Sequence, residues 1–387
     1  MNKQYNISDR VNILRQALTS DKNKVAFLLG AGCPMSILDE NKKPLIPGIA
    51  GLTRTVCEKL DQEKINKLKQ GIALPENKQA TIEDLLGRIR SLIDVIGESE
   101  FDGLKKQDLT DMEKKICEEI TEEVDKELPN QITPYHNLAS WISGIPREHP
   151  VEIFTPNYDL LMELSFESKN IPFFDGFLGS RNAFFDLHSM EYEELPARWV
   201  RLWKLHGSVN WWMDDNGKMF RGNSKNKDSN KQMIYPSHLK YLQSRRMPYL
   251  AMQDRLSNFL STGQSVLVTN GYSFVDQHLN EIITQRLSAN PRAVCFGLLY
   301  DEIENYPEAL ECAQKTTNLH LISKNAAYFA GEKKEWKNDE TDNQYLYLTS
   351  QDSDSNKIEC KIGDFAAFSQ FLLKQTGDYD MERENES

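Results

Sequence analysis

The stretch Val25-Ala-Phe-Leu-Leu-Gly-Ala-Gly-Cys-Pro-Met-Ser36 decides which fold this chain adopts. Five apolar residues followed by a small-residue turn are typical of a buried parallel strand that runs into a tight loop. Gly30 and Gly32 lack the Cβ atoms that would hold a ligand away from the backbone. If a helix follows, its free N–H groups form an anion site suited to a pyrophosphate. An ordinary strand-to-loop turn is the alternative, because the pattern is neither a full G-x-G-x-x-G nor a P-loop.

Size and charge narrow the class of protein. The chain has 387 residues, enough for a large α/β domain with a smaller one and a sizeable core. Its 58 acidic and 46 basic residues give a formal net charge of −12, which argues against strong direct nucleic-acid binding. No apolar run approaches the roughly eighteen residues of a membrane helix, and the N-terminus lacks a signal-peptide apolar region. We therefore expect a cytoplasmic protein without membrane contact.

The cysteines are far apart, and no pair has C-x-x-C spacing. This spacing argues against a zinc ribbon and against a disulfide framework, so we expect no bound metal. Cys33 differs from the others because it lies inside the glycine loop, and packing is favoured over catalysis there. The six are Cys33, Cys57, Cys117, Cys295, Cys312 and Cys360.

Apolar runs alternate with helical patterns along most of the chain. Strands alternating with helices predict an α/β fold with a doubly wound, mainly parallel Rossmann-like sheet. Helices fit Asp276–Leu287 and Glu302–Lys315, and the polar segment from Lys218 to Gln232 is predicted to be a loop. Further strands are expected at Val151–Thr155, Val200–Leu205, Ser265–Thr269, Arg292–Gly297 and Leu319–Ser323.

One long segment interrupts this alternation. Between residues 53 and 130 the pattern is charged and helical without a convincing strand, and a simple βαβ crossover takes far fewer residues. We therefore predict a helical insertion at 53–130. Residues 1–52 would form the first part of the Rossmann-like domain and 131–375 its remainder, followed by a disordered acidic tail at 376–387.

Polar clusters follow the carboxyl ends of the predicted strands, where open parallel sheets bind their ligands. One such coincidence would mean little, but five in one chain indicate a common site. The clusters are Gly30–Ser36, Thr155–Asp159, Leu205–Ser208, Thr269–Phe274 and Ser323–Asn325.

Each cluster also has a purely structural interpretation. Asn157 and Asp159 are residue types that form turns and cap helices. His206 is open to interpretation as a hydrogen-bonded structural histidine, and Gly271–Phe274 as a simple turn. Asp276 is most simply the cap of the helix that follows it.

Taken in order, these motifs resemble those of the sirtuin family. Sirtuins carry Gly-Ala-Gly-x-Ser, then Thr-Gln-Asn-x-Asp, then His-Gly and then Gly-Thr-Ser. The stretches Leu205–Trp212 and Met233–His238 resemble more closely the zinc-free sirtuin-like domains of bacterial antiphage defence proteins. The corresponding series here is Gly30-Ala31-Gly32, Thr155-Pro-Asn157-Tyr-Asp159, His206-Gly207 and Gly271-Tyr-Ser273, within a resemblance that runs from about Val25 to Asn325.

The chain also departs from the sirtuin pattern. Cys33-Pro34 precedes Met35-Ser36 in the glycine loop, and Pro156 stands where the family usually has glutamine. The Asp-Phe-Arg of deacetylating sirtuins and their four zinc cysteines are absent from the sequence. These two losses argue against deacetylation of acetyl-lysine peptides and leave the dinucleotide pocket intact.

The resemblance implies roles for individual residues around NAD⁺. Asn157 would orient the nicotinamide ribose and the attacking water, and His206 would accept a proton. The other residues would hold the dinucleotide without a metal. Gly30, Ala31 and Gly32 would bind the pyrophosphate, Asp159 would shape the nicotinamide side, and Gly271, Ser273 and Ser323 would contact phosphate and adenosine ribose.

The function implied by the resemblance is an NAD⁺ glycohydrolase that depletes cellular NAD⁺ as an abortive-infection effector against phage. Such an enzyme would need to be held inactive by homo-oligomerisation or by a partner, such as a HerA-type DNA-translocating ATPase. The helical insertion is the candidate assembly surface. The alternatives are an NAD-dependent protein deacylase and a module that senses NAD⁺ or a related nucleotide without hydrolysing it.

Overall fold

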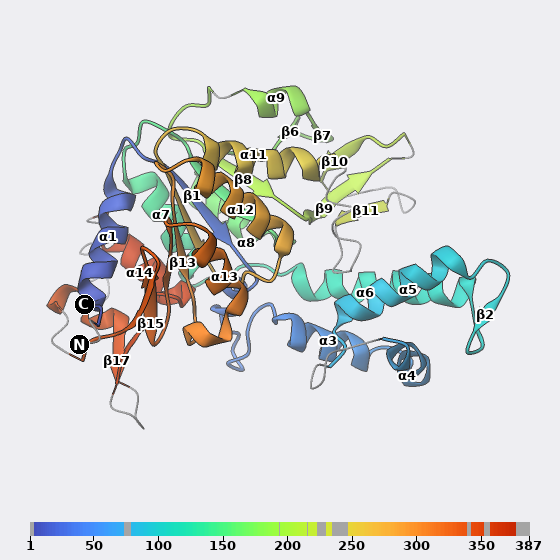
Figure 1. Ribbon diagram of the computed structural model, residues 1–387. Helices are drawn as coiled ribbons and strands as arrows, with labels where there is room; N and C mark the ends of the chain where they lie inside the picture. Colours follow the sequence, from blue (N-terminus) through green and yellow to red (C-terminus); the bar gives the residue numbers. More distant parts are fainter. Residues whose placement is uncertain are drawn as a thin grey trace.

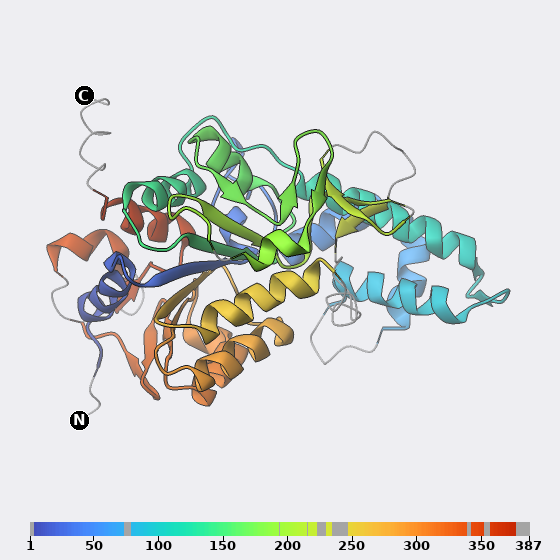
Figure 2. The same ribbon diagram turned by 90° about the horizontal axis from the view of Figure 1, so that it is seen from above.

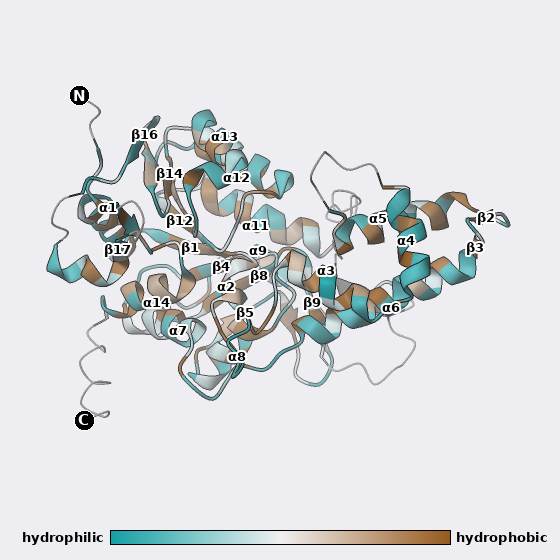
Figure 3. Ribbon diagram, turned by 90° about the horizontal axis from the view of Figure 1, so that it is seen from below, coloured by the Kyte–Doolittle hydropathy of each residue, from teal (hydrophilic) through white to brown (hydrophobic). Residues whose placement is uncertain are grey.

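A nine-stranded sheet forms the centre of the computed structural model, which describes residues 4–72, 79–192, 194–214, 216–222, 230–233, 247–338, 342–351 and 357–376. Its strands are β1 (Lys24–Leu29), β4 (Val151–Thr155), β5 (Phe173–Phe174), β8 (Val200–Lys204), β12 (Ser265–Asn270), β13 (Val294–Leu298), β14 (Leu319–Ile322), β15 (Ala326–Phe329) and β16 (Glu332–Glu335). They lie in the order β16-β15-β14-β13-β12-β1-β4-β8-β5 (Figures 1 and 3). All neighbours from β14 to β5 are parallel, whereas β15 and β16 add antiparallel strands at one edge. The predicted, mainly parallel α/β sheet is confirmed.

Strand β1 is the point where the chain changes direction across the sheet. From β1 the chain continues to β4 on one side, and it later returns to place β12 on the other. The switch point therefore lies between β1 and β12, where sheets of this kind form a crevice at their carboxyl ends. Both faces of β1 are covered, because Phe27 and Leu29 belong to one buried cluster while Ala26 and Leu28 belong to another.

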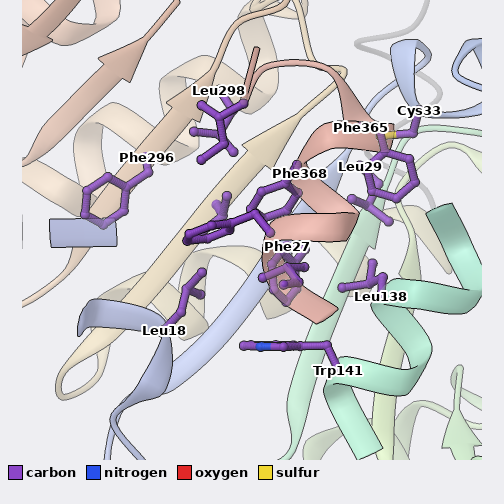
Figure 4. Packing of buried hydrophobic residues seen from close by; sticks show 14 of the residues in the cluster. Leu18, Phe27, Leu29, Cys33, Leu138, Trp141, Phe296, Leu298, Phe365 and Phe368 are labelled. Atoms are coloured by element: carbon purple, nitrogen blue, oxygen red, sulfur yellow. The ribbon is translucent and has the colours of Figure 1, made fainter. Parts of the chain in front are cut away.

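Helices cover both faces of the sheet, as a doubly wound fold requires. One face carries α1 (Ile7–Thr19), α7 (Pro134–Gly144), α8 (Leu161–Ser168) and α14 (Phe365–Leu373), and the other α11 (Tyr249–Ser261), α12 (Gln277–Ala289) and α13 (Pro307–Lys315). Phe27 on β1 is buried by aromatic side chains from two of these helices. Its ring centroid lies 5.4 Å from that of Trp141 on α7 and 6.1 Å from that of Phe368 on α14 (Figure 4). Burying one such side chain contributes about 1.5 to 3 kcal/mol.

Four helices and a short hairpin form a projecting unit, which we call the helical module (residues 49–124). They are α3 (Ile49–Glu58), α4 (Gln62–Gln70), α5 (Ile82–Val95), β2 (Glu100–Phe101), β3 (Leu104–Lys105) and α6 (Lys106–Val124). Their apolar faces bury a cluster of their own, while polar faces point outward (Figures 1 and 3). Thr81 and Asp84 form a capping box at the start of α5. The hairpin β2–β3 was not expected from the sequence.

A second, five-stranded sheet combines strands from both sides of β8 in the sequence, because β6 and β7 precede β8, whereas β9, β10 and β11 follow it. It has the order β11-β9-β10-β7-β6, and two of its strands correct the predicted loop from Lys218 to Gln232. Phe220 pairs with Trp212 on the neighbouring strand, and Met219 is buried, so tertiary pairing overrides the polar composition of this segment. The strands are β6 (Phe177–Leu178), β7 (Ala183–Phe185), β9 (Gly207–Met213), β10 (Met219–Arg221) and β11 (Asn230–Met233).

The remaining elements refine the predicted boundaries. The helix expected over Glu302–Lys315 divides into a 3₁₀ turn, η1, and α13, because Pro307 occupies the first turn of α13. Only Thr376 of the predicted tail lies within the described residues. Across those residues, no helix combines the length and the apolar character needed to cross a bilayer. The other short elements are α2 (Gly32–Met35), α9 (Leu187–Glu191), η1 (Ile303–Asn305), η2 (Asn343–Leu348), β17 (Thr349–Gln351) and β18 (Ile358–Cys360).

His320 on β14 makes the stability of this fold depend on pH. Burial lowers the pKa of its imidazole to about 4, with Arg10 acting in the same direction, and the ring stacks on Phe329 at 4.5 Å. The unfolded chain binds this proton below about pH 6.5, so stability is lost as the pH falls from there toward 4. We expect the wild type to lose about 2 to 3 kcal/mol more than His320→Gln over this window, measured by urea unfolding. Equal losses in the two proteins would contradict this assignment.

Candidate active site

The loops after β1 and β4 are locked together at the carboxyl edge of the sheet. The Asn157 side-chain amide donates to the Gly30 carbonyl at 3.0 Å. The Thr155 hydroxyl donates to the Leu29 carbonyl at 2.7 Å and accepts the Asn157 N–H at 3.0 Å. Asn157, one of the two predicted catalytic residues, therefore lies directly beside the glycine loop.

The glycine loop is also in backbone contact with the turn after β12. The Gly32 N–H donates to the Gly271 carbonyl at 2.9 Å, and a Cβ on Gly30 would lie 2.3 Å from that same oxygen. Gly271 itself has φ +63°, and a Cβ there would lie 2.5 Å from the Cys33 nitrogen. The sequence suggested that these glycines leave room for a ligand. In the structure, the missing Cβ atoms instead allow the glycine loop and the turn at Gly271 to pack directly against each other.

These contacts limit which amides of the glycine loop remain for an anion. Gly30 donates its N–H to Asn270 at 2.9 Å, and Gly32 donates to Gly271. The N–H of Ala31 has no backbone acceptor among the described residues, and Ala31 is exposed where it begins the four-residue helix α2. Of the three predicted pyrophosphate contacts, only Ala31 therefore presents an available amide.

His206 is paired with a carboxylate from the opposite side of the switch point. Its Nε2 lies 3.2 Å from Oδ2 of Asp276. His206 follows β8 and Asp276 precedes α12, and the strands leading to them, β8 and β12, are separated in the sheet by β4 and β1. The pair therefore reaches over the carboxyl ends of the two central strands.

Asp276 has two roles, and only one was expected from the sequence. Its Oδ1 accepts the N–H groups of His278 and Leu279, which makes it the predicted cap of α12. Its Oδ2 faces His206, a role the sequence did not reveal. If the carboxylate accepts the proton on Nε2, Nδ1 of the imidazole is the nitrogen that can accept a proton from a substrate.

A buried charged cluster lies behind these loops. Burial raises the pKa of the Asp159 carboxyl, Lys204 opposes this shift and Glu163 adds to it. The Lys204 ammonium is 2% exposed, donates to the backbone carbonyl of Asp159 and lies 3.3 Å from Oε1 of Glu163. Asp159 also accepts the Leu161 N–H at 3.1 Å, as expected of a residue that starts α8. A lysine inside the buried strand β8 was the sequence signal for this cluster.

The remaining predicted residues differ in their access to a ligand. Ser273 is exposed beside Gly271. Ser323 is 1% exposed and donates its hydroxyl to the Ala326 carbonyl at 2.8 Å, so it is not available to a ligand in this structure. Cys33 is fully buried with its thiol directed at the Asn270 carbonyl, and burial raises the pKa of that thiol, which makes it unreactive.

Comparison with known proteins shows what part of this chain is similar to. A family model described as a SIR2-like domain matches residues 151–322. This part of the chain is similar to SIR2-like domains. The matched region extends from β4 through β14 and includes Asn157, Asp159, His206 and Gly271, whereas the glycine loop lies before it. No curated protein matches the chain.

The solved structures that are similar to this chain are distant. One, described under the mechanism and regulation of Sir2 enzymes, is 13% identical, with 84% of this chain and 93% of that chain covered and a TM-score of 0.38. Another, a histidine-to-asparagine mutant of a Sir2 homologue in complex with ADP-ribose, is 15% identical, with 74% and 85% covered and a TM-score of 0.36. These likenesses are too weak to place any residue or ligand in this chain. Among the described residues, no group of three or more His, Cys, Asp or Glu is placed to hold a metal.

Proposed function

We propose that the SIR2-like domain hydrolyses the bond between nicotinamide and ribose in NAD⁺. The observation that carries this proposal is the contact between His206 and Asp276 over the ends of β4 and β1. The turn that leads to Asp276 touches the glycine loop at Gly30, and Asn157 binds that same residue. Loops far apart in the sequence thus bring a base, a carboxylate and an amide to one edge of the sheet.

These side chains suit the chemistry of the reaction. Nicotinamide is a good leaving group, so the transition state resembles a ribosyl oxocarbenium ion, and the protein has to orient the ribose and one water. Nδ1 of His206 would accept a proton from the water or from a ribose hydroxyl, while Asp276 stabilises the resulting imidazolium. Asn157, fixed by its bond to Gly30, would orient the ribose and the water.

The dinucleotide would lie along the turns on either side of the switch point. The Ala31 N–H and the exposed Ser273 hydroxyl beside Gly271 would contact the pyrophosphate. Asp159, buried beneath the same edge, would support the nicotinamide side. Because His206 is only 5% exposed, the loops after β8 and β12 would have to separate for the ribose to reach its imidazole.

Nicotinamide release from NAD⁺ separates this proposal from its alternatives. The purified full chain is incubated with NAD⁺, with and without an acyl-lysine peptide, and nicotinamide is quantified by chromatography. Release without peptide is expected. Turnover only with the peptide would identify a deacylase, whereas NAD⁺ binding without release in either arm would identify a sensor.

We further propose that the enzyme depletes cellular NAD⁺ as an antiphage effector and is controlled by assembly. The helical module is the candidate assembly surface, because it has its own buried cluster and projects from the sheet (Figure 2). The partner would be a second copy of the chain or a HerA-type DNA-translocating ATPase. Sedimentation of the full chain alone and with such an ATPase, together with NAD⁺ levels in infected cells, tests this role.

The two roles of Asp276 can be separated by substitution. Asp276→Ala removes both the cap of α12 and the partner of His206, whereas Asp276→Ser keeps a capping hydroxyl and removes the carboxylate. We expect Asp276→Ala to lose about 1 kcal/mol of unfolding free energy and Asp276→Ser clearly less. Both variants should lose nicotinamide release to the same extent, at least about tenfold. Wild-type activity in Asp276→Ser would show that the carboxylate does not act through His206.

A further inference from the structure

A polar cavity lies at the amino-terminal edge of the sheet, opposite the candidate active site. Its volume is about 130 Å³, and it opens where β1, β4 and β8 begin, beneath the carboxyl-terminal half of α11. His206 follows the other end of β8, so this cavity is separate from the proposed NAD⁺ site. We call it the cationic cavity, and its charged and polar lining includes Lys24, His149, Glu152, Arg201, Arg255 and Thr262.

The pairing of β4 with β8 builds the floor of the cationic cavity. Glu152 and Arg201 are partners in the parallel register, and an Arg201 guanidinium N–H donates to Oε1 of Glu152 at 3.1 Å. Trp203 donates its indole N–H to Oε2 of the same carboxylate at 2.6 Å. Both oxygens of Glu152 are thus occupied by donors from β8.

The cationic cavity contains more positive than negative charge. Arg255 reaches the same carboxylate from α11, with a guanidinium nitrogen 3.6 Å from Oε1 of Glu152. Lys24 adds an ammonium group 3.5 Å from the hydroxyl of Thr262. The lining therefore contains three basic side chains, Lys24, Arg201 and Arg255, and one carboxylate, Glu152.

Arg255 shows that this excess is not fully compensated within the protein. The residue is 9% exposed, and its buried Nε–H has no hydrogen-bond partner in the described part of the chain. The carboxyl end of α11 and the ring of Trp203, 5.5 Å from the guanidinium carbon, both favour a cation here. Neither accepts a hydrogen bond from Nε, and a buried donor without an acceptor is unfavourable. Nε itself has almost no accessible surface, so an anion in the cavity would bind this guanidinium through its other N–H groups, one of which also donates to the Met190 carbonyl at 3.4 Å.

We propose that the cationic cavity binds a phosphate group. Guanidinium and ammonium donors are the groups that proteins use for phosphate oxygens. A water molecule occupies about 30 Å³ of liquid, so the cavity has room for one tetrahedral oxyanion. Pockets for drug-sized ligands measure about 300 to 1,000 Å³, which excludes a whole nucleotide. The ligand is therefore free phosphate or the terminal phosphate of a molecule whose remainder lies outside.

Calorimetric titration of the full chain with inorganic phosphate, against chloride at equal ionic strength, tests the proposal. Lys24→Gln removes one cation at the half-buried rim, and Lys22→Gln removes an exposed lysine two residues earlier that does not line the cavity. We expect wild type and Lys22→Gln to bind phosphate equally and Lys24→Gln to bind at least about tenfold more weakly. No phosphate heat in the wild type, or equal affinity in all three proteins, would overturn the proposal.

A parallel titration with glycerol 3-phosphate identifies the source of the phosphate. Tighter binding than inorganic phosphate, again lost in Lys24→Gln, assigns the site to a terminal phosphate. Equal or weaker binding assigns it to the free ion. Neither result depends on NAD⁺ cleavage, so this proposal and the proposed function stand or fall separately.

Discussion

Replacing His206 with alanine is expected to lower nicotinamide release from NAD⁺ by about 100-fold or more. A positioned general base contributes roughly 10² to 10⁴ in rate, and Nε2 of His206 lies 3.2 Å from the carboxylate of Asp276. Asn157→Ala should also strongly reduce nicotinamide release, because the variant lacks the side-chain amide that the Gly30 carbonyl holds beside the glycine loop. Initial rates of nicotinamide formation by the full chain measure both effects.

The matched control is His188→Ala, because His188 is an exposed histidine on α9 whose ring packs edge-on against Tyr192. It should release nicotinamide at the wild-type rate. Urea unfolding of all three variants shows whether any loss of rate comes from loss of fold. If His206→Ala and Asn157→Ala both kept the wild-type rate, the catalytic assignment would be wrong even if NAD⁺ were cleaved.

The sheet could be predicted because its central strands are buried on both faces. Such strands appear in the sequence as continuous apolar runs. Four of these runs correctly predicted strands β1, β4, β12 and β14, which contain Phe27, Phe154, Leu267 and Leu321. The edge strand β16 has no such pattern, since it reads Glu-Lys-Lys-Glu and is recognised only by its pairing with β15. Local composition fails where long-range pairing alone forms the strand.

The candidate site could be predicted only in part, for a related reason. The rule that ligands bind at carboxyl ends of parallel strands brought Asn157, His206 and Gly271 to one edge. It does not say which groups touch there. The position of Asp276 before α12 is fully explained by its role as a helix cap, so there was no reason in the sequence to expect its contact with His206. Lys204 was not singled out from the sequence, although it is a charged residue in a buried strand, and its partners Asp159 and Glu163 are defined only by the fold.

The glycines at the switch point give the largest expected effect on stability. In Gly271→Ala the new Cβ would lie 2.5 Å from the Cys33 nitrogen, with backbone atoms rather than a flexible side chain in the way. The left-handed φ of +63° adds about 1 to 2 kcal/mol for any L residue. We expect a total loss of about 4 kcal/mol or more in the free energy of unfolding, measured with urea.

Two further alanine variants divide this loss into its causes. Gly263 has a similar φ of +66° but nothing within 4 Å of its Cβ position, so Gly263→Ala should lose only the same conformational cost of about 1 to 2 kcal/mol. Gly30 is not left-handed, yet its Cβ would lie 2.3 Å from the Gly271 carbonyl oxygen, so Gly30→Ala isolates the steric cost. Equal, small losses in all three would mean that the two turns are not in contact. The glycine loop would then be free to approach a dinucleotide, as its sequence first suggested.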